Sequence, residues 1–168
     1  MTASQNNTPQ SVTYATVTWD QLHRDARALA STLMNEYPSF KGIVAITRGG
    51  LIPAAILARE LGCRVVESVS VASYEGEEGT QKEPKTLKAP LAAGDGEGFL
   101  IVDDLVDSGV TARYVRDMLP KGLFVCLYAK PEGRPYTDHY VTEVPQDTWV
   151  LFPWDTAPLF VPPLSRSR

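Results

Sequence analysis

The sequence predicts an α/β protein with a mainly parallel central sheet flanked by helices. Short apolar runs of strand length recur along the chain, and segments with helical periodicity lie between them. Strands that alternate with helices pair in parallel, because each crossover helix returns the chain to the same edge of the sheet. At 168 residues the chain has the length of one domain with a sizeable core.

Composition and charge exclude several classes of protein. With 43% hydrophobic and 21% charged residues, the chain has the balance of an ordinary globular protein. Its net charge of -4 supplies no overall positive field, so nucleic acid is not expected as a partner. The polar N-terminus lacks the pattern of a secretion signal, and no apolar stretch reaches the roughly 18 residues of a membrane span. We therefore expect a cytoplasmic protein.

The first half of the chain contains two predicted helices and two predicted strands. Residues 1–13 are polar and are expected to form a disordered extension, so that a single folded domain covers residues 14–168. Apolar residues from Leu22 to Leu33 recur at helical spacing, and Thr18 precedes them as a cap. In chain order, the predicted elements are a helix over 19–36, a strand over 42–47, a helix over 51–61 and a strand over 64–73.

Residues 75–98 differ from their surroundings. Gly, Glu, Lys and Pro dominate this segment, and core-forming side chains are nearly absent. A loop of this length inside a compact domain is usually functional or disordered. Taken by itself, the composition favours a solvated insertion.

The second half continues the alternation and then changes character. A strand begins at residue 99, a helix over 112–119 ends before a proline, and another strand follows over 123–129. Residues 130–168 are rich in Pro and aromatic side chains. We expect them to form a small C-terminal hood packed over the edge of the sheet.

Residues 99–111 contain the most specific pattern in the chain. Four apolar residues run directly into Asp103 and Asp104, and a third acid, Asp107, begins a short loop that carries hydroxyl side chains. The strand would place the acids at the carboxyl edge of the sheet, where open α/β sheets bind ligands. The loop would open a helix whose free N–H groups suit a phosphate. An acid pair alone more often caps a helix or forms a turn, but the whole arrangement is far more specific.

A second glycine-containing turn is predicted at the same edge of the sheet. Thr47-Arg48-Gly49-Gly50 follows one strand and precedes one helix. The glycines let the backbone approach an anion closely, and Arg48 adds positive charge. By itself such a turn is a weak signal.

These motifs together resemble the type I phosphoribosyltransferases, and among them the bacterial xanthine-guanine phosphoribosyltransferases. The similarity extends over residues 14–163. Ser108 and Val110 stand where the family often has Thr and Gly, and Ser108 keeps the hydroxyl donor. The segments that carry the resemblance are 17–20, 48–51, 58–62, 94–99, 103–107, 129–131, 133–135 and 145–149.

The resemblance implies the type I phosphoribosyltransferase fold and a site for phosphoribosyl pyrophosphate (PRPP). Asp103 and Asp104 would engage the ribose hydroxyls, with Asp104 as the ligand of the implied cofactor, Mg²⁺. The turn at Arg48 and Gly49 would bind pyrophosphate, and in the family the peptide bond entering the arginine is commonly cis. Lys82 would also contact pyrophosphate, from a flexible active-site loop over 75–98. The remaining PRPP contacts would be Leu105, Val106, Asp107, Ser108, Gly109, Val110 and Thr111, with 106–111 around the 5′-phosphate.

The resemblance also implies a purine site. Asp107 would handle the proton of the purine imidazole ring as general acid or base, beside Asp103 and Arg48 as the other predicted catalytic residues. Lys130 would donate to the exocyclic oxygen of a 6-oxopurine, which adenine lacks. Trp149 would stack on the purine face, and Val150 would contact its edge through the backbone.

The predicted function is therefore a Mg²⁺-dependent transferase of purine salvage. It would form XMP or GMP, and IMP less well, with pyrophosphate, from PRPP and xanthine, guanine or hypoxanthine. The resemblance implies a homotetramer and permits a peripheral association with the inner membrane. Two alternatives stay open: a hypoxanthine-guanine enzyme that does not use xanthine, and a non-catalytic regulator of the same fold.

Overall fold

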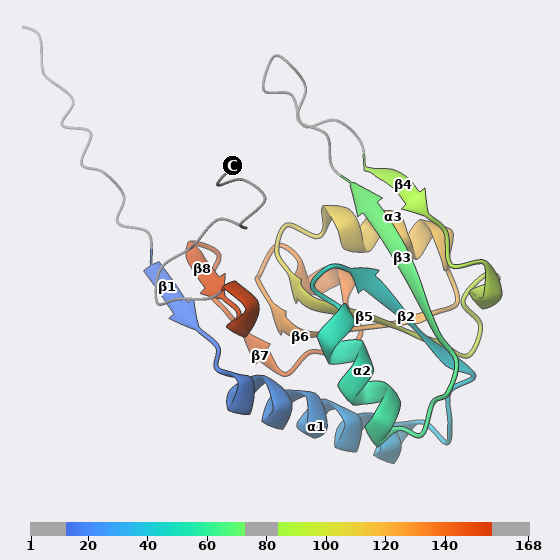
Figure 1. Ribbon diagram of the computed structural model, residues 1–168. Helices are drawn as coiled ribbons and strands as arrows, with labels where there is room; N and C mark the ends of the chain where they lie inside the picture. The colour runs from blue at the N-terminus through green and yellow to red at the C-terminus, as the bar shows by residue number, and fades with distance from the viewer. Residues whose placement is uncertain (1–12, 73–83, 156–168) are drawn as a thin grey trace, which may run out of the picture. The chain divides into compact units, whose positions relative to one another are not determined.

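The structure is a computed structural model that describes residues 13–72 and 84–155 (Figure 1). The chain divides into two compact units. The larger unit is Trp19–Gln146, and the smaller unit is made of the described residues on either side of that range.

The larger unit contains a six-stranded sheet in the order β4-β3-β2-β5-β6-β7. Neighbouring strands pair in parallel, except that β3 and β4 are antiparallel. The predicted mainly parallel sheet is thus confirmed. The strands are β2 (Gly42–Thr47), β3 (Val66–Ala72), β4 (Lys85–Lys88), β5 (Phe99–Val106), β6 (Leu123–Ala129) and β7 (Thr142–Glu143).

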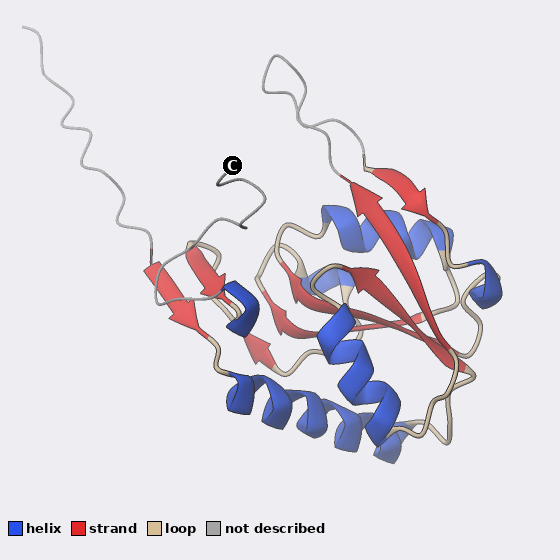
Figure 2. Ribbon diagram, in the orientation of Figure 1, coloured by secondary structure: helices blue, strands red, loops and turns tan. Residues whose placement is uncertain are grey.

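Helices cover both faces of this sheet (Figure 2). α1 (Trp19–Glu36) and α2 (Leu51–Glu60) lie on one side, and α3 (Val110–Met118) lies on the other (Figure 1). Because both faces are buried, β2, β5 and β6 carry continuous apolar runs rather than alternating ones.

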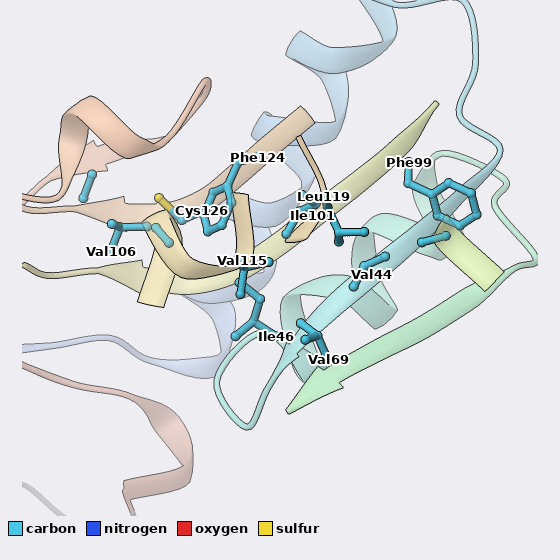
Figure 3. Packing of buried hydrophobic residues seen from close by; sticks show 13 residues of the cluster. Val44, Ile46, Val69, Phe99, Ile101, Val106, Val115, Leu119, Phe124 and Cys126 are labelled. Atoms are coloured by element: carbon cyan, nitrogen blue, oxygen red, sulfur yellow. The ribbon is translucent and has the colours of Figure 1, made fainter. Parts of the chain in front are cut away.

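A hydrophobic core joins the sheet, α3 and the segment before β5. Successive side chains of a strand point to opposite faces, so alternate residues of the central strands enter this core. Figure 3 labels ten of its side chains: Val44, Ile46, Val69, Phe99, Ile101, Val106, Val115, Leu119, Phe124 and Cys126.

Most predicted elements are present, with shifted ends. The second helix ends one residue before the predicted 61, and β3 is shorter than the predicted 64–73. α3 begins at Val110 rather than 112, because Gly109 takes a left-handed conformation (φ 81°) that turns the chain directly into the helix. Three predicted elements match the structure in their bounds: 19–36, 42–47 and 123–129.

The prediction of a loop over 75–98 is wrong for its second part. Lys85–Lys88 forms β4, and the short 3-10 helix η1 (Leu91–Ala93) follows it. β4 pairs with β3 only, so it is an edge strand, and edge strands tolerate exposed lysines and little burial. For that reason the residues of β4 resemble those of a loop in composition.

The smaller unit contains a two-stranded parallel sheet. β1 (Thr13–Thr16) pairs with β8 (Thr148–Leu151), and the 3-10 helix η3 (Pro153–Asp155) follows. Because β1 begins at Thr13, that residue does not belong to the predicted extension, whose other residues lie outside the described ones.

The predicted hood over 130–168 is divided between the two units. The 3-10 helix η2 (Arg134–Tyr136) and β7 belong to the larger unit, and β8 belongs to the smaller one. One folded domain over 14–168 with a C-terminal hood stays a prediction.

Candidate active site

Parallel pairing brings the ends of β2, β5 and β6 to one edge of the sheet. β5 lies between the other two strands, and the three run in the same direction. The Lys130 N–H, directly after β6, donates to the Val106 carbonyl at the end of β5 (N···O 2.9 Å). The predicted site residues after these strands therefore share one edge, which is where open α/β sheets bind ligands.

Asp103 and Asp104 lie near the carboxyl end of β5, as predicted, and belong to the strand itself. The strand continues to Val106 because Asp103, Leu105 and Val106 still pair with β6. As neighbours on a strand, the two acids face opposite sides of the sheet. Asp103 lines a cavity on the α3 side, whereas Asp104 contacts the turn after β2.

Local hydrogen bonds orient both carboxylates. Asp103 accepts from the Asp104 N–H at 3.0 Å, and Asp104 accepts from the Leu105 N–H at 2.7 Å. Asp103 is only 8% exposed, and this burial, with the charge of Asp104 beside it, raises its pKa well above the usual range. Both effects act against the charged form of Asp103.

The turn after β2 lies directly against β5. A Cβ at Gly49 would lie 2.3 Å from the Asp104 carboxyl, and one at Gly50 would lie 2.2 Å from the Val102 carbonyl oxygen. No larger residue fits this approach. The peptide bond between Thr47 and Arg48 is cis, as expected from the resemblance, and the Arg48 side chain is exposed.

A cavity of about 110 Å³ lies where β5 leads into α3. Gly109, with its positive φ, ends the loop, and Val110 already belongs to the helix, so a non-glycine residue at 110 is accommodated. The first N–H groups of a helix lack acceptors within it and attract anions. The cavity is lined by Asp103, Leu105, Val106, Asp107, Ser108, Gly109, Val110, Thr111 and Ala112.

Asp107 forms the centre of a hydrogen-bonded cluster beside this cavity. Lys130 Nζ donates to Asp107 Oδ2 at 2.8 Å, and Gln146 Nε2 donates to Asp107 Oδ1 at 2.9 Å. The Lys130 side chain is 6% exposed and that of Asp107 is 53% exposed. The buried Lys130 ammonium group thus pairs with the half-exposed Asp107 carboxylate. Both groups lie at the edge that holds the acid pair.

Comparison with known proteins identifies the family. Residues 18–160 match the model of the phosphoribosyl transferase domain. The chain belongs to the phosphoribosyltransferase family. Its α/β architecture is the type I fold of that family, as predicted.

Individual relatives of this phosphoribosyltransferase narrow the assignment. The xanthine-guanine phosphoribosyltransferase of Gluconobacter oxydans (strain 621H) is 80% identical over 168 residues, which are 100% of this chain and 99% of that protein. The enzyme of the same name from Nitratidesulfovibrio vulgaris (strain DP4) is 55% identical over 148 residues, 88% of each chain. Among solved structures, a purine phosphoribosyltransferase from Pyrococcus horikoshii is 30% identical with a TM-score of 0.73, covering 89% of this chain and 99% of that one.

The positions of three predicted site residues of this phosphoribosyltransferase relative to this edge stay predictions. Lys82 lies outside the described residues. Trp149 and Val150 belong to β8 in the smaller unit, where Trp149 is 55% exposed and Val150 is buried opposite Ala15. Their contacts with a purine stay predictions.

Three residues that shape the site were not predicted from the sequence. Gln146 binds Asp107, and the Tyr136 ring packs against Gly109, where a Cβ would lie 2.2 Å from the ring. A Cβ at Gly133 would lie 2.5 Å from the carbonyls of Val106 and Asp107. All three lie in or near motifs that carry the family resemblance, which is the one signal that points to them.

Two negative findings concern the described ranges. No helix within them is long and apolar enough to cross a membrane. Nor do three or more His, Cys, Asp or Glu side chains gather there as a ready-made metal site.

Replacing Gly49 with Ala should lower the free energy of unfolding by about 1–3 kcal/mol, because the new methyl group and the Asp104 carboxyl cannot both keep their places. Chemical denaturation measures this loss. In an Asp104→Ala background the carboxyl is gone, so the same substitution should cost much less. If Gly49→Ala lowered the free energy of unfolding equally in the wild type and in Asp104→Ala, the Asp104 carboxyl would not be what excludes a side chain at position 49.

Proposed function

We propose that the chain transfers the 5-phosphoribosyl group of PRPP to xanthine or guanine, and less well to hypoxanthine, with release of pyrophosphate. The observation that carries the proposal is the convergence at one sheet edge of the β5 acid pair, the Arg48-Gly49 turn, the helix-opening cavity and the Asp107–Lys130 pair. The 80% identity to a xanthine-guanine phosphoribosyltransferase supports the choice of purines.

The 5′-phosphate of PRPP would bind in the cavity formed by residues 105–111. The loop presents Ser108 and Thr111 hydroxyls, and the N-terminus of α3 supplies N–H donors and the positive end of its dipole. Asp103 and Asp104, in the part of β5 that leads to this cavity, would accept hydrogen bonds from the ribose hydroxyls. The donor sugar is thereby held at both ends, which orients its reacting carbon.

Mg²⁺ fits the residues that are present. Magnesium proteins commonly use one or two carboxylates together with substrate phosphates, rather than a full set of protein ligands. Asp104, partly exposed beside the Arg48-Gly49 turn, would be that carboxylate. When bound, the ion would offset the negative charge of the leaving pyrophosphate.

The pyrophosphate would leave toward the turn after β2. Arg48 is exposed and charged, so its guanidinium is available to an anion. Lys82 is the other proposed contact. Donors placed around the leaving group stabilise the charge that develops as the bond between C1 of the ribose and pyrophosphate breaks.

Asp107 and Lys130 would bind the purine. As the ring nitrogen bonds to the ribose carbon, the imidazole ring loses a proton, and Asp107 is the open carboxylate that can take it. Lys130 would donate to the exocyclic oxygen at position 6. Trp149, an exposed aromatic side chain, and the Val150 backbone are the remaining proposed contacts.

We also propose a homotetramer in the cytoplasm, with at most a peripheral association at the inner membrane. The larger unit exposes several large apolar side chains, and subunit contacts would bury them. These side chains include Met34, Leu51, Ile52, Val65, Val66, Leu87 and Leu91.

An assay of the purified protein with PRPP, Mg²⁺ and each purine tests the proposal. Nucleotide should form with xanthine and guanine, and more slowly with hypoxanthine. Product with guanine and hypoxanthine but not xanthine would select the hypoxanthine-guanine alternative. No product with any base would overturn the enzyme assignment in favour of a binding protein.

Asp107→Asn should lower kcat by roughly 10²- to 10⁴-fold, because an amide of the same shape cannot take the proton. Steady-state kinetics measures the loss. The variant should stay folded at the assay temperature, with a lower thermal unfolding midpoint because the buried Lys130 ammonium loses its counter-charge. Full turnover in this variant would remove Asp107 from the proton transfer.

Lys130→Met should raise the KM for guanine by roughly 10- to 100-fold, because a hydrogen bond from a charged donor is lost. The KM for PRPP should stay close to that of the wild type, since the cavity at residues 105–111 contains no atom of Lys130. Initial rates with each substrate varied in turn separate the two constants. Equal losses for both substrates would contradict a base-specific role.

A further inference from the structure

Gln146 connects three parts of the base site. Its Nε2 donates to Asp107 Oδ1 at 2.9 Å, and its Oε1 accepts from the Glu132 N–H at 3.1 Å. Its main-chain carbonyl accepts from Lys130 Nζ at 3.4 Å. One residue therefore contacts the acid, the lysine and the turn that comes after the lysine.

The carboxamide of Gln146 has one favourable orientation. If it were reversed, its oxygen would face the Asp107 carboxylate and its amino group would face the Glu132 N–H, so both hydrogen bonds would be lost. The turn at Glu132 thus directs the amino group of Gln146 toward Asp107.

Lys130 would have to share its ammonium group between Asp107 and a bound purine. Its buried ammonium group is paired with Asp107 Oδ2. The group has three donors, of which one bonds Asp107 and one reaches the Gln146 carbonyl at 3.4 Å, so turning a donor to a purine oxygen would move the ammonium group and weaken its bond to the carboxylate. The bond from Gln146 to Oδ1 is independent of this exchange and keeps Asp107 in place.

We propose that Gln146 is a positioning residue of the purine site, which holds the Asp107 carboxylate toward the imidazole edge while Lys130 turns to the exocyclic oxygen. This inference rests on the proposed function, since it assigns Gln146 a part in the same reaction. The alternative is that Gln146 only stabilises the fold, by joining its own segment to the turn at Glu132.

Two substitutions separate these roles. Gln146→Met keeps the length of the side chain and removes both side-chain hydrogen bonds. Gln146→Glu keeps an oxygen for the Glu132 N–H and turns a second oxygen toward Asp107, where it repels the carboxylate. Both should lower kcat/KM for guanine by about 10-fold or more, while the KM for PRPP is unchanged. Full activity of Gln146→Glu would overturn the proposal, because that variant keeps the bond to the Glu132 N–H and loses the bond to Asp107.

A double-mutant cycle tests whether Gln146 acts through Asp107. In an Asp107→Ala background there is no carboxylate to position, so Gln146→Met should have no further effect on kcat/KM for guanine. The same fold loss in both backgrounds would overturn the inference.

Glu143→Gln is the matched control. It breaks the exposed ion pair between Arg134 and Glu143 (3.2 Å), which joins the same two segments but touches neither Asp107 nor Lys130. Guanine kinetics should be unchanged, and a loss like that of Gln146→Met would favour the structural tie. A wild-type protein that forms no nucleotide would instead overturn the proposed function, so the two failures are distinct.

Discussion

The site depends on the close contact between the turn after β2 and the middle of β5. Backbone packs on backbone there, because Gly50 lies against the Val102 carbonyl and Gly49 lies against the Asp104 carboxyl. Parallel pairing of β2 and β5 sets the direction of both strands, and the two glycines let the turn approach β5 this closely. As a result an arginine and two acids from distant parts of the sequence meet at one edge.

Burial and pairing divide the acids of this edge into different environments. Asp103 is buried and accepts a backbone N–H, Asp104 faces the glycine turn, and Asp107 is half exposed with a cation and an amide as partners. Three carboxylates within five residues would repel one another in a uniform medium. The charge of Asp104 still acts on Asp103 and raises its pKa, whereas Lys130 compensates the third acid.

Features that depend on local pattern were predictable, and features that depend on distant contacts were not. The strands over 42–47 and 123–129 could be predicted because both faces are buried, so each apolar run is uninterrupted. β4 was missed because an edge strand with exposed lysines has no such run. The start of β5 at residue 99 was predicted, but its end was not, since acids are unusual within a buried strand and pairing with β6 carries the strand to Val106.

The same distinction applies within the site. The loop over 105–111 is encoded by one continuous motif, and the structure places all seven of its residues around one cavity. The contact of Gln146 with Asp107 spans 39 positions and depends on the path of the chain through η2 and β7, which no spacing rule anticipates. The turn at Gly133 is similar, because its need for glycine arises only from the carbonyls of Val106 and Asp107.

The bond between the Lys130 N–H and the Val106 carbonyl has a thermodynamic consequence. It joins the backbone that begins the phosphate-lining loop to the backbone of the buried lysine, and Asp107 is the next residue after Val106. A ligand that orders the loop therefore also restricts the residues on the other side of Asp107. By linkage, such an effect is reciprocal: occupancy of one part changes affinity at the other by the same factor. Through this one main-chain bond, a ligand that ordered the loop would also act on the segment that begins at Lys130.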